Sequence, residues 1–217
     1  MHTFLPHSML LAFLGTSLAL AATPGPGVLF IVTRTLSQGR SAGLVSVAGV
    51  ALGNLGNAVG ASLGLAALFA LSAVAFSIVK LLGACYLVYL GWCALGIRDE
   101  RGAGRDVQVA AELSLSRIFR DGFWVALLNP KTAIFFAAFL PQFLDRQAQG
   151  MLQSVCLGAI FVTIAACTDT AYVLAAARVA PAMRRLSNGM TWGRYLTAGV
   201  FFGLGIFTAV AGHRTSD

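Results

Sequence analysis

The sequence predicts an all-α integral membrane protein, and three observations lead to that class. The 217 residues are 58% hydrophobic and 11% charged, and their mean hydropathy is +0.80. The apolar residues form long runs with few charges, and runs of about 18 or more such residues are typical of transmembrane helices. The basic residues lie mostly between these runs, where they set the orientation of a membrane protein. These observations together exclude a soluble domain.

We expect six transmembrane helices, arranged as two inverted repeats of three helices each. The first repeat occupies residues 1–97 and the second occupies residues 116–217, with a cytoplasmic connection over residues 98–115. An odd number of spans per repeat gives the two repeats opposite orientations in the membrane, as in many secondary transporters. The expected spans cover residues 4–36, 42–71, 73–97, 118–144, 151–179 and 191–211.

The first and fourth spans are both broken, at residues 24–27 and 129–131. Proline lacks a backbone N–H and clashes with the preceding helical turn, so no regular helix passes through either break. Broken backbone at membrane depth is tolerated only where it is buried in protein or lines a watered cavity. Two interrupted spans at matching places point to the binding site of a secondary transporter. The residues expected to contact substrate there are Pro24, Gly25, Pro26, Asn129, Pro130 and Lys131.

Asp169 is the acidic residue that lies deepest inside a predicted span. A carboxylate at that depth costs at least about 2.5–3.5 kcal/mol on insertion scales, and such groups usually face a cavity or a partner. Burial disfavours the charged form, so such a carboxyl group can bind and release a proton near neutral pH. We therefore expect Asp169 to couple transport to protons. The alternative is a structural ion pair with Lys131.

Five glycines recur on one face of the second span, and small residues on one face let another helix approach closely. Asn57 lies near the edge of this face and Asn54 lies much further round the helix. Asn57 is therefore the residue of the two that we expect to bind substrate. The same face also allows a homodimer, although contacts within one chain give the same pattern. The glycines are Gly49, Gly53, Gly56, Gly60 and Gly64.

The charges in the loops predict the orientation. Eleven arginines, Arg34 among them, follow the first, third and fifth spans, whereas three cations lie on the opposite side. By the positive-inside rule the first group faces the cytoplasm and both chain termini lie on the other side.

Soluble-enzyme chemistry is not expected, and neither is a cofactor. No HExxH, GxSxG or P-loop motif occurs, and the histidines lie only at the chain ends. The aromatic residues alternate with apolar residues and not with basic ones, so we expect no nucleic-acid partner. Transport energy would then come from an ion gradient, and one coupled proton suffices.

Several motifs occur in order along nearly the whole chain and resemble the LysE/RhtB family of bacterial amino-acid exporters. The resemblance implies a six-helix exporter in the inner membrane that moves amino acids or close derivatives and is driven by the proton motive force, for which we expect proton antiport. In that membrane the orientation given by the arginine count makes both termini periplasmic. The resemblance also implies that the two breaks line the substrate path, and that Asp169 matches an acid often found in the fifth span of this family. The motifs include ATPGP at 22–26, GRSAGL at 39–44, KLLGA at 80–84, NPK at 129–131 and PQF at 141–143.

Two other functions remain open on the same fold. One is a metal-ion or other small-solute exporter, and a metal-ion exporter would need several convergent carboxylate, histidine or cysteine ligands. The spans offer Asp169 and scattered cysteines, so no metal site is expected. A thiol-disulfide carrier would need cysteines beside the proline breaks, and none of the four cysteines lies there. The expected partners are a small amino acid, a coupling proton and the lipid bilayer.

Overall fold

The computed structural model describes residues 6–62, 73–95, 114–143, 150–186 and 191–210. This described part contains helices and no strand, which confirms the all-α class. Its helices are α1 (His7–Ala22), α2 (Pro26–Gln38), α3 (Arg40–Ser62), α5 (Ala73–Leu95), α6 (Leu115–Leu127), α7 (Pro130–Ile134), α8 (Gly150–Leu186) and α9 (Thr191–Val210).

Both predicted breaks are present. The axes of α1 and α2 differ by 48°, and those of α6 and the segment Pro130–Phe143 differ by 46°. After α7 the second broken segment continues as a π-helix, η1 (Phe135–Phe139), and a 3₁₀ turn, η2 (Leu140–Phe143). Each break begins a new helix with proline in its first turn, where a backbone N–H would have no acceptor within that helix.

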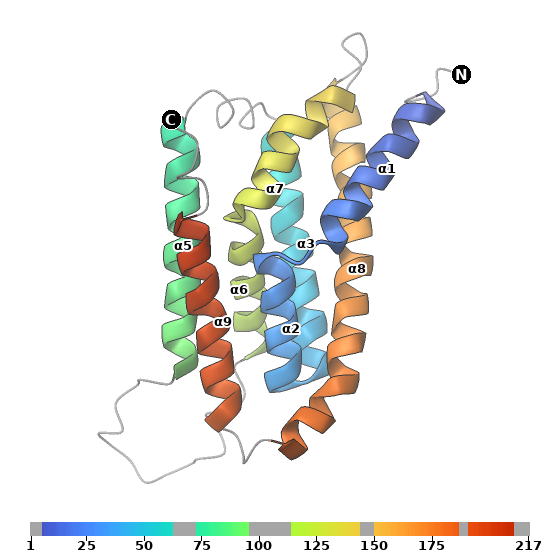
Figure 1. Ribbon diagram of the computed structural model, residues 1–217. Coiled ribbons are helices and arrows are strands. Elements are labelled where there is room, and N and C mark those ends of the chain that lie inside the picture. The colour runs from blue at the N-terminus through green and yellow to red at the C-terminus, as the bar shows by residue number, and fades with distance from the viewer. Residues whose placement is uncertain (1–5, 63–72, 96–113, 144–149, 187–190, 211–217) are drawn as a thin grey trace.

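Three helices are long and apolar enough to cross a membrane, within α3, α5 and α8, and each bent pair can serve as one further span. The apolar part of α9 that is described, Thr197–Val210, is shorter. In Figure 1 successive spans run in alternating directions, and α9 runs toward the end of the bundle at which α1 begins.

The helix bounds differ from the predicted spans mainly in α8. This helix has 37 residues and continues through Pro181 to Leu186, whereas the prediction ended it at residue 179. Residues 63–72 of the second predicted span lie outside the described residues, as does nearly all of the predicted connection over residues 98–115. The repeat boundaries therefore stay a prediction.

The glycine face of α3 contacts α6 inside the chain. A Cβ atom at Gly53 would lie 2.8 Å from the Cβ of Ala126, and one at Gly49 would clash with the carbonyl of Phe119. Only glycine lets the two backbones come this close. Helix α6 therefore covers this face around Gly49 and Gly53, and contacts within one chain account for the glycines there.

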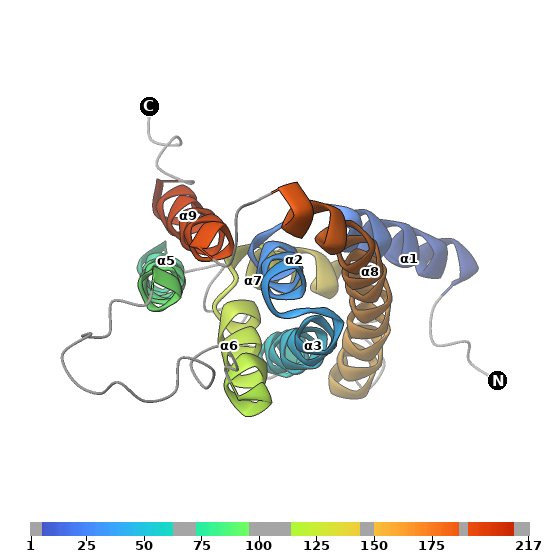
Figure 2. The ribbon, with the colours of Figure 1, turned by 90° about the horizontal axis from the view of Figure 1, so that it is seen from below.

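Helix α2 lies at the centre of the bundle. Figure 2 shows it enclosed by α3, α6, α8 and α9, all of which contact it. Helix α5 packs on α9 at the outer side. One core cluster, which includes Phe30, Ile31 and Phe201, surrounds α2, and a second, which includes Phe13, Phe136 and Phe161, lies beside α1 and η1. The two breaks lie between these clusters.

Gly39 alone connects α2 to α3. Its φ is 90° and its ψ is −178°, a backbone conformation that is almost restricted to glycine and costs other residues about 1–3 kcal/mol. The chain can therefore reverse direction in a single residue at this point.

We expect Gly39→Ala to lower the free energy of unfolding by about 1–3 kcal/mol, because alanine is strained at this φ. The midpoint of thermal unfolding in detergent would measure the loss. Gly15→Ala is the matched control, since Gly15 lies within α1 and a Cβ there would meet no atom within 4 Å. Equal midpoints for the two variants would contradict the assignment of strain to Gly39.

Candidate functional site

A small cavity of about 50 Å³ lies where the two helix breaks meet. A buried water occupies roughly 10–15 Å³ on this measure, so a few waters fit. The apolar wall takes residues from both core clusters, among them Val50 and Phe161. The polar wall consists of Thr23, Asn54, Asn129, Lys131, Thr132 and Asp169.

The cavity brings together half of the residues that the sequence predicted for the site. Gly25, Asn129, Lys131 and Asp169 line it. The others do not line it, and they act on the backbone around it: Pro24, Pro26, Pro130 and Asn57.

Lys131 ties the second break to the first. Its Nζ donates hydrogen bonds to the carbonyl of Leu20 at 2.8 Å and to the carbonyl of Thr23 at 2.5 Å. Both carbonyls belong to the C-terminal end of α1, where a helix leaves its acceptors unsatisfied and favours a cation. An ammonium group has three donors, so one donor of Lys131 remains for a ligand.

The prolines leave three carbonyls without their normal helical donors, since residue i donates to residue i−4 in a helix and proline has no N–H. The carbonyl of Leu20 lacks the N–H of residue 24, the carbonyl of Ala22 lacks that of residue 26, and the carbonyl of Ala126 lacks that of residue 130, because each of these residues is a proline. Each of these carbonyls accepts a hydrogen bond from a distant side chain. Two of them also accept a backbone N–H three residues on, from Thr23 to Leu20 at 3.2 Å and from Asn129 to Ala126 at 3.1 Å. The donors are Lys131 Nζ to Leu20, the Tyr172 hydroxyl to Ala22 at 2.8 Å, and Asn57 Nδ2 to Ala126 at 2.9 Å.

The two helix starts at the breaks differ in their free donors. At α7, Asn129 Oδ1 accepts the backbone N–H of Lys131 at 3.1 Å, which caps that helix. At α2 the N-cap is Gly25, which has no side chain to serve as a cap. In the described part of the chain the N–H groups of Gly27 and Val28 have no acceptor, and both residues line the cavity. The start of α2 is therefore the open anion-binding end.

The side chain of Asp169 faces the cavity from α8 and is 5% exposed. Lys131 is the charge that acts on it electrostatically, yet no nitrogen of Lys131 lies within 4.0 Å of its carboxylate. No described group donates a hydrogen bond to this carboxylate. The structural ion pair with Lys131, which the sequence left open, is not formed in this conformation.

Asn54 and not Asn57 faces the cavity, which corrects the expectation from the sequence. The glycine face of α3 marks the contact with α6, and Asn57 continues that face one turn after Gly53. Its side chain therefore reaches Ala126 on α6. Asn54 lies about 100° round the helix from Gly53, is 6% exposed and lines the cavity.

The sequence reasoning missed a second buried cluster. Arg34, predicted as one of the loop arginines, instead lies inside α2, and its Nη2 donates to Asp121 Oδ2 of α6 at 3.2 Å. The Tyr86 hydroxyl of α5 donates to Asp121 Oδ1 at 3.1 Å. A signal was available, because Asp121 shares the apolar face of α6 with Ile118 and Val125, at spacings of three and four residues.

Neither alternative function gains an observation from the structure. Within the described ranges, no three His, Cys, Asp or Glu side chains lie close enough to share a metal ion. The four cysteines are exposed and unpaired, and none of them lines the cavity.

We expect Asn57→Ala to lower the free energy of unfolding by about 1 kcal/mol, the size of a hydrogen bond between membrane helices. The Ala126 carbonyl would lose the shorter of its two hydrogen bonds and keep the one from the backbone N–H of Asn129. Chemical unfolding in detergent would measure the loss. Asn54→Ala is the control, because Asn54 only lines the cavity, and an equal loss from both variants would count against the role of Asn57.

The sequence matches the LysE type translocator family over residues 18–212. The homoserine/homoserine lactone efflux proteins of Salmonella typhi and Salmonella typhimurium are each 34% identical over 171 residues, 78% of this chain and 81% of theirs. A Vibrio cholerae protein, described as an uncharacterized membrane protein, is 33% identical over 204 residues, 93% of this chain and 96% of its own. No solved structure matches the chain. The match covers most of the sequence, and the chain therefore belongs to the LysE family of translocators.

Proposed function

We propose that this protein exports amino acids or close derivatives across the bacterial inner membrane in exchange for protons. Membership of the LysE family supports export of a small molecule, and the relatives named for homoserine and homoserine lactone efflux support that substrate class. One observation carries the proposal. A lysine and an unpaired carboxylate, Lys131 and Asp169, face one cavity at two helix breaks.

The cavity suits the two charges of an amino acid. The substrate carboxylate binds the free N–H groups at the start of α2 and the remaining donor of Lys131, since anions are stabilised at helix N-termini. The substrate ammonium binds Asp169. Asn54 and Thr132 are both buried in the same wall and offer hydrogen bonds to a polar side chain such as a hydroxyl. The prolines and Asn57 hold the breaks in place and do not contact the substrate.

Asp169 couples transport to protons because it holds either a proton or the substrate ammonium and not both. On the proton-rich side the carboxyl group is protonated and releases the substrate. On the other side it loses the proton and binds the next substrate. One charge that crosses 100 mV supplies about 2.3 kcal/mol, enough for a roughly 50-fold solute gradient.

Alternating access would follow from two inverted repeats, α1–α5 and α6–α9. The similar bends of the two broken segments, 48° and 46°, support this symmetry. On this proposal α9 is the sixth span, the arginine-rich end faces the cytoplasm, and both termini are periplasmic.

Efflux from bacterial cells tests the function directly. Cells that express the protein are preloaded with homoserine and with mixed dipeptides, and the amino acids that appear outside are measured. We expect selective release of homoserine or a few similar amino acids, abolished by a protonophore and absent from cells without the protein. No selective release, from protein shown to be in the membrane, would contradict the proposal.

We expect Asp169→Asn to abolish proton-driven export while the protein still inserts into the membrane. Asparagine does not bind a proton near neutral pH, and it lacks the negative charge that binds an ammonium group. Asp169→Glu is the matched control and should retain part of the activity. The efflux rate per membrane-inserted protein is the measurement. Export by the asparagine variant at the wild-type rate would remove Asp169 from the coupling step.

A further inference from the structure

The Arg34–Asp121–Tyr86 cluster lies between the level of the cavity and one end of the bundle. Arg34 follows the cavity-lining Val28 by six residues on α2, about 9 Å along the axis. Asp121 precedes the cavity-lining Ala126 by five residues on α6, about 7.5 Å. The cluster therefore lies toward the end where α2 stops and α6 starts (Figure 1). The arginine count predicts that this end faces the cytoplasm.

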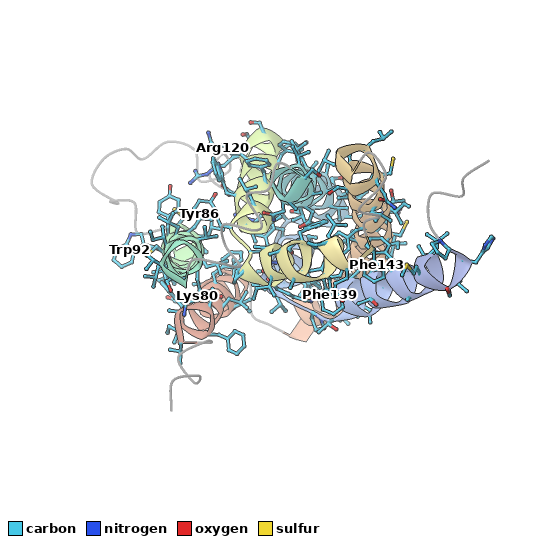
Figure 3. The ribbon with its side chains drawn as sticks, turned by 90° about the horizontal axis from the view of Figure 1, so that it is seen from above. Lys80, Tyr86, Trp92, Arg120, Phe139 and Phe143 are labelled. Atoms are coloured by element: carbon cyan, nitrogen blue, oxygen red, sulfur yellow. The ribbon has the colours of Figure 1, made fainter. Side chains whose placement is uncertain are left out.

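The cluster joins three helices, α2, α5 and α6. The side chains of Arg34 and Asp121 are each 6% exposed, and the guanidinium also lies over the Phe30 ring at 5.3 Å. Figure 3 shows Tyr86 on the side of α5 toward α6, whereas Trp92 lies on the outer side of α5. A buried ion pair that loses one partner leaves an uncompensated charge, which is strongly unfavourable. Something must replace both charges when α2 and α6 separate.

Arg34 has a donor that the closed cluster does not use. Its Nε is buried and has no hydrogen-bond partner, and Asp121 accepts a hydrogen bond from Nη2. A carboxylate that binds both Nε and Nη2 would make the paired contact that arginine favours. Arg117 and Arg120 also act electrostatically on Asp121, so this end of the cluster is cationic and attracts an anionic group.

We propose that this cluster is a second substrate site and gate, at which a zwitterionic amino acid exchanges with the Arg34–Asp121 pair before it reaches the central cavity. The substrate carboxylate accepts hydrogen bonds from Nε and Nη2 of Arg34, and the substrate ammonium pairs with the carboxylate of Asp121. No charge is left unpaired during opening. This inference rests on the proposed function, because it assigns the substrate of the same transport cycle.

The test measures the opening of the gate separately from transport. The four native cysteines are replaced by serine, and Val50, which lines the cavity and is 3% exposed, is replaced by cysteine. A membrane-impermeant thiol reagent is added to inverted vesicles, whose cytoplasmic face is outside, and the labelling rate is recorded with no addition, with homoserine and with homoserine lactone. The lactone is the matched ligand because it lacks a free carboxylate. Arg40→Gln is the control variant, since Arg40 is exposed at the same end.

We expect homoserine to accelerate labelling several-fold more than the lactone does. Asp121→Asn should raise the rate without ligand about tenfold, because it breaks the buried pair, and should remove the response to homoserine. Arg34→Lys keeps the positive charge and lacks Nε. Its labelling rate without ligand should therefore stay low, and homoserine should no longer raise it. Arg40→Gln should change neither rate.

Two results would overturn the inference. One is an unchanged rate in Asp121→Asn from folded protein. The other is an increase in labelling rate with homoserine that is as large in Arg34→Lys as in the parent protein. The cluster would then hold the helices together without binding substrate. Labelling only from the opposite face would overturn the cytoplasmic placement. Homoserine efflux by the parent protein is measured in parallel, to separate this inference from the proposed function. If the protein exports homoserine but homoserine does not change the labelling rate, the gate is contradicted and the proposed function is not.

Discussion

The structure depends on one constraint, which is that a carbonyl group deprived of its helical donor must find another donor inside the membrane. The hydrocarbon region of a membrane offers no water, so a backbone group left unsatisfied there costs several kcal/mol. The prolines of the two breaks create three such carbonyls, at Leu20, Ala22 and Ala126. All three accept a hydrogen bond from a side chain that lies far away in the sequence, and for Ala22 this is the donor in place of the helical one, whereas Leu20 and Ala126 also accept a nearby backbone N–H.

These donors connect the two halves of the chain in both directions. The carbonyls of the first break are held by Lys131 and Tyr172, which belong to the second half, and the carbonyl of the second break is held by Asn57, which belongs to the first. Neither break is complete on its own. The cavity therefore forms only where both halves meet, and the charge that stabilises the end of α1 also faces the ligand space.

The sequence was sufficient for the class, the breaks and the two charges of the cavity, because prolines and ionisable residues are conspicuous inside apolar runs. It was insufficient for the choice between Asn54 and Asn57, which depends on the helix that covers the glycine face of α3. The same holds for Arg34 and Asp121, which are 87 residues apart. Periodicity gives the face on which a residue lies, and only the tertiary arrangement gives what that face contacts.

The single residue between α2 and α3 has a mechanical consequence. Gly39 gives the two helices no spare length, so the C-terminal end of α2 and the N-terminal end of α3 cannot move apart. Arg34 lies on α2 near this connection, and Asn57 lies on α3 and donates to the second break. The ion pair of Arg34 and the hydrogen bond at the second break therefore belong to one continuous helical hairpin, so the two contacts cannot be rearranged independently of the connection between them.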